Sequence, residues 1–473
     1  MDGIDPDRLA DALRVLADAE QLPTDHPDAV AVQRATAKLY KRVRERRRAE
    51  RRAAIAANDD AVTAATATGA PGRIDDETQG LQLAPSVAGG TAGTLLRARA
   101  CYVCKQRYRE VDAFYHQLCP PCAARNHERR HARTDLTGRR ALLTGGRAKI
   151  GMYIALRLLR DGAHTTITTR FPHDAVRRFS AMPDSGDWLH RLRIVGIDLR
   201  DPAQVLALAD DVAAQGPLDV LVNNAAQTVR RSPQAYAHLA AAEQAAPAGE
   251  VPEVVTLGRG AHATGTAALT EGHWSPTPHA LSALALTAGS ASVERLEAGT
   301  AVDAGGLAPD LDPDNSWSQV VGEVDAVELL EVQLCNETAP FLLLSRLRPA
   351  LAASKARRKY VVNVSAMEGQ FSRGYKGPGH PHTNMAKAAV NMLTRTSASE
   401  LLAEDGILMT SVDTGWITDE RPHPTKMRLA DEGFHAPLDL VDGAARVYDP
   451  IVRGEAGEDV HGVFLKDYEE SAW

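Results

Sequence analysis

A glycine-rich turn between an apolar run and an amphipathic stretch is the first feature of this chain that predicts chemistry. The run covers residues 141–143 and the stretch covers 152–160, which is the pattern of a strand followed by a helix. Glycine lets a pyrophosphate approach the backbone, and the N–H groups at a helix start attract it. The turn predicts a dinucleotide site, with a plain helix start as the alternative, at Thr144, Gly145, Gly146, Arg147, Lys149, Ile150 and Gly151.

Four of the five cysteines have the spacing of a metal site. They form two C-x-x-C pairs with 14 residues between them, Cys101 with Cys104 and Cys119 with Cys122. Two such pairs place four thiolates around one tetrahedral ion, so we expect structural zinc. The alternative of two disulfides or a redox pair is disfavoured in a reducing cytoplasm. Because four thiolates complete the ligand set, three nearby histidines are expected at the surface, namely His116, His127 and His131.

The segment around these cysteines, residues 97–133, is called the four-cysteine module below. It is too small to build a core of its own, so metal binding would supply its folding free energy. Only residues 131–138 separate it from the first predicted strand, which predicts that it packs on the domain that follows. Its aromatic residues either form a binding face or, as we favour, fill a small core; they are Tyr102, Tyr108, Phe114 and Tyr115.

Further strand-like runs follow the glycine turn, and each ends in residues able to contact a cofactor. The runs cover 164–169, 192–197, 218–222, 360–364 and 407–412. The residues that follow them include Arg170, Asp198 with Leu199, the turn Asn224, Ala225 and Ala226, and the group Thr414, Gly415, Ile417 and Thr418.

In this order and spacing, the chain resembles the short-chain dehydrogenase/reductase family. Members of that family carry a Thr-Gly-rich first turn, an Asp-apolar pair beside the adenine, and an Asn-Asn-Ala-Gly-like turn after the fourth strand. The resemblance covers roughly residues 137–227 and 317–473. It implies an α/β fold with a doubly wound parallel Rossmann sheet of about seven strands, preceded here by the small zinc-binding module and a helical N-terminal arm.

The resemblance also implies a proton relay of Tyr, Lys, Ser and Asn, and two of these residues are missing. Asn336 and Lys387 match, and Lys387 would also hold the nicotinamide ribose. Thr383 stands at the tyrosine position, and Ser365 lies one residue before the serine position, which holds Ala366. Because a threonine hydroxyl is a far weaker acid than tyrosine, whose pKa is about 10, the family's proton transfer cannot be carried over whole.

Substitutes for the missing acid lie in a long loop before Lys387. Histidine titrates near neutral pH and would serve as an acid, so His382 is our first candidate. Tyr375 is the second, and His380 and a shifted Ser365 are further candidates. The alternative is that the His-Pro-His sequence is a structural or metal-trapping turn.

Charge predicts the cofactor. Arg170 follows the second strand, where enzymes that prefer NAD usually place an acid, and it would suit a 2′-phosphate. Arg147 and Lys149 add positive charge nearby, so we expect NADP, with NAD as the alternative. Lys149 replaces the middle glycine, which requires the turn to reshape if the pyrophosphate is to approach closely.

Length and composition limit the class of protein. The chain has 473 residues, which exceeds one domain of ordinary size, and 44% of them are hydrophobic. No run of 18 apolar residues exists and the first residues do not resemble a signal peptide, so we expect a cytoplasmic protein without a membrane partner. The net charge of −7 argues against nucleic acid as the partner of the whole chain.

Four regions are expected along the chain, with boundaries at residues 57, 96 and 133. A helical basic arm (1–57) carries nine Lys or Arg against two Glu between residues 38 and 52. It could bind phosphates, although a solvated helix is favoured. A flexible Ala/Thr/Gly-rich linker (58–96), the four-cysteine module and the Rossmann domain (137–473) follow.

The Rossmann domain contains an insertion at about 228–316. Asn224 and Asn336 lie 112 positions apart, where the family has a few tens of residues. The ends of this insertion could form a lid or a specificity element, and a decorative loop is equally compatible.

We expect an NADP-dependent oxidoreductase that transfers hydride between the cofactor and a small carbonyl or alcohol substrate through an altered relay. The alternative is a catalytically silent dinucleotide-binding scaffold that recruits a partner through its zinc module. Family members commonly form dimers or tetramers, so a homo-oligomer is compatible with this interpretation.

Overall fold

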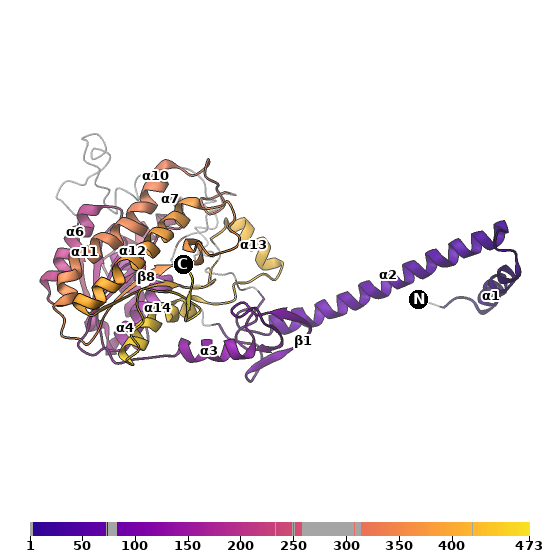
Figure 1. Ribbon diagram of the computed structural model, residues 1–473, viewed down its shortest axis with the longest axis horizontal. Helices are drawn as coiled ribbons and strands as arrows, with labels where there is room; N and C mark the ends of the chain where they lie inside the picture. Colours follow the sequence, from indigo (N-terminus) through magenta and orange to yellow (C-terminus); the bar gives the residue numbers. More distant parts are fainter. Residues whose placement is uncertain are drawn as a thin grey trace.

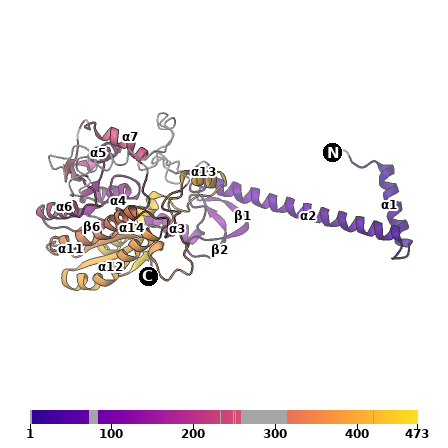
Figure 2. The same cartoon turned by 90° about the horizontal axis from the view of Figure 1, so that it is seen from above.

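The computed structural model describes residues 3–71, 73, 83–231, 233–247, 249, 251–257, 307, 314–418 and 420–473. A rounded body carries the sheet, and a long helical arm projects from it (Figure 1). The N-terminus lies at the far end of the arm, whereas the C-terminus lies on the body, and the view from above shows the same arrangement (Figure 2).

A nine-stranded sheet forms the centre of the body, in the order β11-β10-β9-β8-β6-β3-β4-β5-β7. All neighbours run parallel except β11, which is antiparallel to β10. The strands are β3 (Arg140–Leu143), β4 (His164–Thr169), β5 (Leu192–Gly196), β6 (Val220–Asn223), β7 (Glu253–Thr256), β8 (Lys359–Ser365), β9 (Ile407–Asp413), β10 (Phe464–Lys466) and β11 (Glu469–Ser471). The expected doubly wound parallel sheet is confirmed, and two edge strands extend it. One of them, β7, comes from the insertion.

Helices cover both faces of the sheet. One layer contains α4 (Lys149–Arg160), α5 (Pro172–Ser180) and α14 (Leu440–Glu455), and the other contains α6 (Pro202–Ala214), α11 (Ala339–Ala352) and α12 (Pro381–Asp405). Every residue of β8 and β9 is buried, because a parallel strand with helices on both sides has no solvent face. The shorter elements are η1 (Ser185–Asp187), η2 (Leu189–Arg191), α7 (Pro233–Glu243), α10 (Ala326–Gln333), the π-turn η4 (Leu334–Thr338), η5 (Met367–Gly369) and α13 (His423–Asp431).

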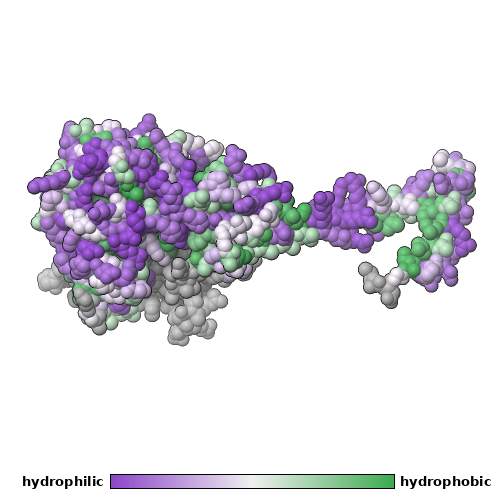
Figure 3. All heavy atoms as spheres, turned by 90° about the horizontal axis from the view of Figure 1, so that it is seen from below, coloured by the Kyte–Doolittle hydropathy of each residue, from purple (hydrophilic) through white to green (hydrophobic). Residues whose placement is uncertain are grey.

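The arm consists of two helices, α1 (Pro6–Gln21) and α2 (Pro27–Ala64), each with proline in its first turn. Ala29 is the only buried residue within these two helices, all of whose residues are described. The middle of α2 is hydrophilic, and a hydrophobic patch lies at the far end of the arm (Figure 3). Exposed apolar residues of that end are Ile4, Leu9, Leu13, Val15 and Leu16.

The expectation of a flexible linker over residues 58–96 is wrong for the parts that the structure describes. Helix α2 continues to Ala64, and β1 (Thr91–Ala100) pairs antiparallel with β2 (Arg107–Asp112) of the four-cysteine module. The Asp59 carboxylate accepts hydrogen bonds from the backbone N–H groups of Leu96 and Arg97, at 2.7 and 3.1 Å. Hydrogen-bond partners that are distant in the sequence hold this segment in a fixed conformation. Its lack of local periodicity was therefore misleading. Residues 72 and 74–82 lie outside the described residues.

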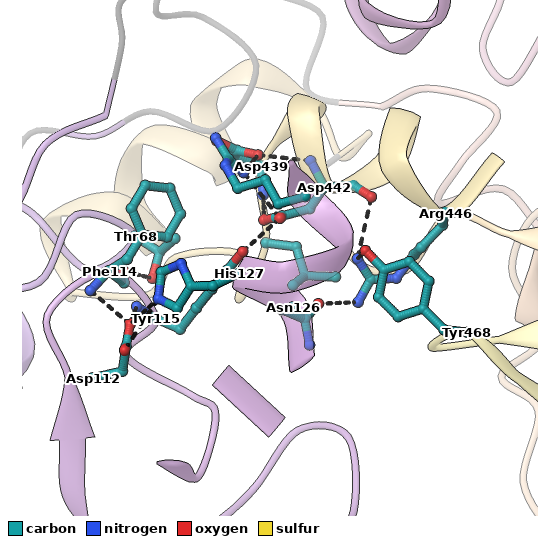
Figure 4. Close-up of polar contacts among 12 residues, drawn as sticks. Thr68, Asp112, Phe114, Tyr115, Asn126, His127, Asp439, Asp442, Arg446 and Tyr468 are labelled. Atoms are coloured by element: carbon teal, nitrogen blue, oxygen red, sulfur yellow. Dashed lines mark hydrogen bonds and ion pairs between the residues drawn. The ribbon is translucent and has the colours of Figure 1, made fainter. Parts of the chain in front are cut away.

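The four-cysteine module packs against the Rossmann domain, as its short connection predicted. Helix α3 (Pro120–Arg130) lies along α14, and Figure 4 shows the polar contacts between them. Arg130 donates to both oxygens of Asp439 at 2.6 and 2.8 Å, and the Tyr115 hydroxyl donates to Asp442 at 2.6 Å. Buried charge-assisted bonds of this kind fix the orientation of two elements.

One of the three histidines expected at the surface is buried. His116 is 2% exposed, and its Nδ1 lies 2.8 Å from the Thr68 hydroxyl. Burial, with help from Arg73, lowers the pKa of His116 to about 3, so the ring is neutral at physiological pH. His127 is half-buried beside Asp112, and His131 is exposed. The surface expectation failed for His116 because the segment before β1 packs over it.

Candidate functional site

The glycine turn is closed by the turn that follows β6. Gly145 has φ +71°, a conformation that favours glycine. The Thr144 hydroxyl oxygen accepts hydrogen bonds from the N–H groups of Asn224 and Ala225, both at 3.0 Å. In return, the Asn224 amide donates to the carbonyls of Thr144 and Gly145, both at 3.1 Å. A Cβ on Gly151 would lie 1.9 Å from the Gly145 oxygen, so this close approach requires glycine.

Lys149 has a left-handed backbone conformation. Its φ is +53°, a region that glycine adopts more easily than lysine. Its Nζ lies 3.9 Å from a carboxylate oxygen of Glu420, beyond β9. Burial opposes ionisation of Glu420, but the charges of Lys149, Arg231 and Lys426 outweigh it and lower its pKa to about 2. Sequence patterns gave no signal for Glu420, because its cations come from three distant segments.

Two arginines converge on one aromatic ring beside the glycine turn. The Arg147 and Arg170 guanidinium carbons lie 5.4 and 5.8 Å from the centre of the Phe171 ring. Arg147 also pairs with Asp174. Arg170 donates to the Tyr236 hydroxyl at 3.1 Å and lies 5.0 Å from the centre of that ring. Tyr236 belongs to α7, so the insertion reaches the expected 2′-phosphate position.

Asp198 is held in a buried network. Its carboxylate accepts from Arg200 Nη2 at 2.7 Å, and Arg200 Nη1 donates to Glu331 on α10 at 2.8 Å. Burial opposes the charge of Asp198, but hydrogen bonds and the charge of Arg200 hold its pKa below the usual range. Leu199 beside it is buried. Arg200 and Glu331 were missed from sequence, since isolated charged residues in turns and helices are most often solvated.

Asn336 lies in the π-turn between α10 and α11, and its side chain binds the residue after the β6 turn. Its Oδ1 accepts from Gln227 N–H at 2.7 Å, and its Nδ2 donates to Gln227 O at 2.9 Å. The Gln227 side chain donates to Glu331 at 2.9 Å. Gln227 therefore links Asn336 to the Asp198 network. Ala226, in the same turn, is exposed.

Lys387 is buried on α12, and its Nζ donates to the carbonyl of Val364 at 2.8 Å. Burial lowers the pKa of Lys387 to about 8, against the smaller effects of Cys335 and Glu368. The Thr383 hydroxyl, one helical turn earlier, donates to the His380 carbonyl at 2.9 Å.

Buried polar atoms around the head of α12, among them Asn384 Oδ1, have no hydrogen-bond partner among the described residues, and two further groups matter for the site. They are the Ser365 hydroxyl at the end of β8 and both ring nitrogens of His382. A carboxylate oxygen of Glu328 lies 4.0 Å from the His382 Nε2. Burial, with the charge of His380, lowers the pKa of His382. Buried unpaired polar atoms are costly, so groups of this kind indicate a place for a ligand.

The other two acid candidates are placed differently. Tyr375 is 74% exposed, in an exposed stretch from Phe371 to Lys376. The structure does not bring it to Lys387. The His380 ring stacks on Trp317 with a centroid distance of 3.9 Å, and its Nδ1 lies 2.9 Å from the Trp317 carbonyl oxygen. The residue that directly follows the insertion therefore fixes the start of α12.

The loop after β9, where the sequence predicts cofactor contacts, is bonded to the four-cysteine module. Gly415 has φ +78°, and its N–H donates to Asp413 at 2.9 Å. The Trp416 N–H donates to the Tyr102 hydroxyl at 2.9 Å. Ile417 is buried. Thr414 and Thr418 are half-buried within the same loop.

The four cysteine sulfurs form one cluster. All Sγ atoms of Cys101, Cys104, Cys119 and Cys122 lie within 4.8 Å of one another, and the Sγ atoms of Cys104 and Cys119 are 3.6 Å apart. All four are free thiols. The geometry fits four sulfur ligands around a single ion.

Comparison with known proteins places the chain in a family. The family model described as short chain dehydrogenase matches residues 139–245. Uncharacterized protein R665 of Acanthamoeba polyphaga mimivirus is 30% identical over 372 residues, which are 75% of this chain and 71% of that protein. A probable oxidoreductase of Streptomyces antibioticus is 42% identical over 94 residues, 19% of this chain and 30% of that protein. The chain belongs to the short-chain dehydrogenase/reductase family of oxidoreductases.

A solved structure, that of a short chain dehydrogenase from Burkholderia cenocepacia J2315 in complex with NADP, is 19% identical with a TM-score of 0.44. The match covers 70% of this chain and 97% of that one. None of the described helices is both long and apolar enough to cross a membrane.

Proposed function

We propose that this protein is an NADP(H)-dependent oxidoreductase acting on a small alcohol or carbonyl, with His382 in place of the family's tyrosine. The observation that carries this proposal is the buried His382, with two unpaired ring nitrogens, near the start of the helix that presents Lys387. Neither Thr383, whose hydroxyl is engaged, nor the exposed Tyr375 offers an equivalent group.

The residues of the glycine turn fit a phosphorylated dinucleotide. The turn has glycine where a Cβ would clash, and α4 begins directly after it. Arg147 and Arg170 converge on Phe171, which suits a 2′-phosphate better than a free hydroxyl. When bound, NADP would supply the hydride acceptor. Lys387 would hold its nicotinamide ribose, as the family resemblance implies.

The lowered pKa of His382 favours a base over an acid. A ring that is neutral at pH 7 accepts a proton, so we assign it to removal of the hydroxyl proton during alcohol oxidation. The Nε2–H would face Glu328, which leaves the Nδ1 lone pair for the substrate hydroxyl. The Glu328 carboxylate would then stabilise the imidazolium that forms, and the same proton would return during carbonyl reduction.

The test is hydride transfer between NADP(H) and a panel of alcohols and carbonyls, with His382→Ala compared to Tyr375→Phe. His382→Ala should lower the rate by about 10²–10⁴ and leave the dissociation constant of NADPH nearly unchanged. Tyr375→Phe, a control in the exposed segment before α12, should behave as the wild type. Equal turnover by His382→Ala and wild type would refute the assignment.

The loss of the family's tyrosine and serine supports a second candidate function, a catalytically silent dinucleotide-binding scaffold. Thr383 and Ala366 stand at those positions. Tight NADPH binding by the wild type without turnover on any member of the panel would favour the scaffold.

We also propose that the four-cysteine module holds one structural zinc ion. The support is the clustering of four free cysteine sulfurs from two separate turns. The site requires a reducing compartment, in keeping with a cytoplasmic protein. Metal analysis of purified protein should find one equivalent of zinc per chain, and Cys104→Ser with Cys122→Ser should abolish it. Less than half an equivalent in the wild type would contradict the proposal.

A further inference from the structure

We propose that the four-cysteine module is a metal-dependent support for the loop after β9, so that loss of the metal weakens dinucleotide binding at a distance. The inference rests on the proposed zinc site and the proposed NADP(H) site. It adds a role for Tyr102 as a positioning residue, acting through Trp416.

The contact between module and loop is direct. Tyr102 lies between the first two cysteines, and its hydroxyl oxygen accepts the Trp416 N–H at 2.9 Å. This N–H lies in a loop that belongs to no helix or strand, and Gly415 beside it has φ +78°. Regular secondary structure therefore supplies no hydrogen-bond acceptor for the Trp416 N–H. Removing the hydroxyl leaves a half-buried donor without its partner, which weakens this loop conformation.

An apolar core is continuous from the cysteines to the cofactor side. Cys101 and Cys119 are buried in the same cluster as Ile417 of the loop, and Ile150 of the glycine turn packs against that cluster. Gly443 on α14 completes the arrangement, because a Cβ there would lie 3.0 Å from Ile417 and 3.4 Å from Ile150. A change in the cysteine turns is therefore transmitted to both segments by direct packing.

The module is held to the Rossmann domain on a second side, so it cannot move independently. Arg130 lies 2.9 Å from Asp442 and also binds Asp439. These two acids, labelled in Figure 4, cap α14. Arg446 of α14 donates to Asn126 of α3 at 2.9 Å. Because these contacts hold α3 on α14, loss of the metal would change mainly the cysteine turns. The loop after β9, which contacts those turns, would then lose its support.

The experiment compares Tyr102→Phe with Tyr40→Phe, an exposed tyrosine on the arm. Zinc content, the dissociation constant of NADPH and hydrogen exchange of residues 414–418 are measured for each, and for wild type after zinc removal with a chelator. Tyr102→Phe should retain zinc, weaken NADPH binding about three- to tenfold and speed exchange at 414–418. Zinc removal should weaken binding further, and Tyr40→Phe should match the wild type.

Unchanged exchange at 414–418 in both Tyr102→Phe and zinc-free protein would overturn the inference. Unchanged NADPH affinity in a wild type stripped of zinc would do the same. A wild type that does not bind NADPH would instead refute the proposed function, and the exchange measurement would still decide whether the module supports the loop.

Discussion

Gly151 is the position where a single methyl group should do the most damage to the cofactor side. In Gly151→Ala, the new Cβ would lie 1.9 Å from the Gly145 carbonyl oxygen and 2.8 Å from the Asn224 amide nitrogen. Carbon and oxygen ordinarily approach no closer than about 3.3 Å, so the carbonyl must shift by roughly 1 Å or more. That carbonyl accepts one of the two Asn224 bonds that close the turn.

The magnitude follows from these contacts. Overpacking costs about 1–3 kcal/mol, and a lost buried hydrogen bond adds about 1 kcal/mol. Alanine regains up to about 1 kcal/mol over glycine in a helix. The free energy of unfolding should therefore fall by about 1–3 kcal/mol, and NADPH affinity should fall at least about tenfold, because the displaced carbonyl distorts the phosphate turn.

Urea unfolding and NADPH titration measure the two effects, with Gly186→Ala as the control. A Cβ added at Gly186 would have no atom within 4 Å, so the control should stay within about 0.5 kcal/mol of wild type. If Gly151→Ala were as stable as the control and bound NADPH as tightly as wild type, the close approach of helix α4 to the turn would be refuted.

Three further predictions follow from the burial of Lys387, the backbone strain at Lys149 and the position at which the N-terminal arm ends. Lys387→Met should stabilise the fold by about 1–3 kcal/mol at pH 7. In urea unfolding, this gain in stability should shrink between pH 8 and 10.5. The pKa of Lys387 is about 8 in the folded protein and about 10.5 in the unfolded chain, so only the unfolded chain keeps the lysine protonated in this range, and the wild type becomes more stable as the pH rises. Lys149→Gly should raise the thermal midpoint, because it removes the strain of a lysine in the left-handed backbone conformation, which costs about 1 kcal/mol. A lower midpoint would mean that the contact with Glu420 outweighs this strain. Deleting residues 1–52 should leave NADPH affinity within about twofold. Deleting residues 1–93 should lower both stability and affinity, because the end of α2 and β1 pack on the four-cysteine module. Equal behaviour of the two deletions would contradict this boundary of the arm.

The sequence alone determined the succession of strands along the chain and the positions of the turns that are expected to bind the cofactor. Strands, glycine turns and the paired cysteines carry their information locally, as periodicity and spacing, and parallel topology then leaves few arrangements. For this reason Thr144, Asn224 and Asn336 were found from sequence, and the structure joins Thr144 to Asn224 and places Asn336 against Gln227.

Only the tertiary structure decided which side chains surround one another. The pairing of Glu420 with Lys149, the link from Gln227 to Glu331 and the bond from Trp416 to Tyr102 join segments far apart in the chain. Local propensity contains no information on such partners, because burial and charge pairing arise only when the domain has folded. The same reason explains why the supposed linker became part of a sheet and why His382 is buried whereas Tyr375 is exposed.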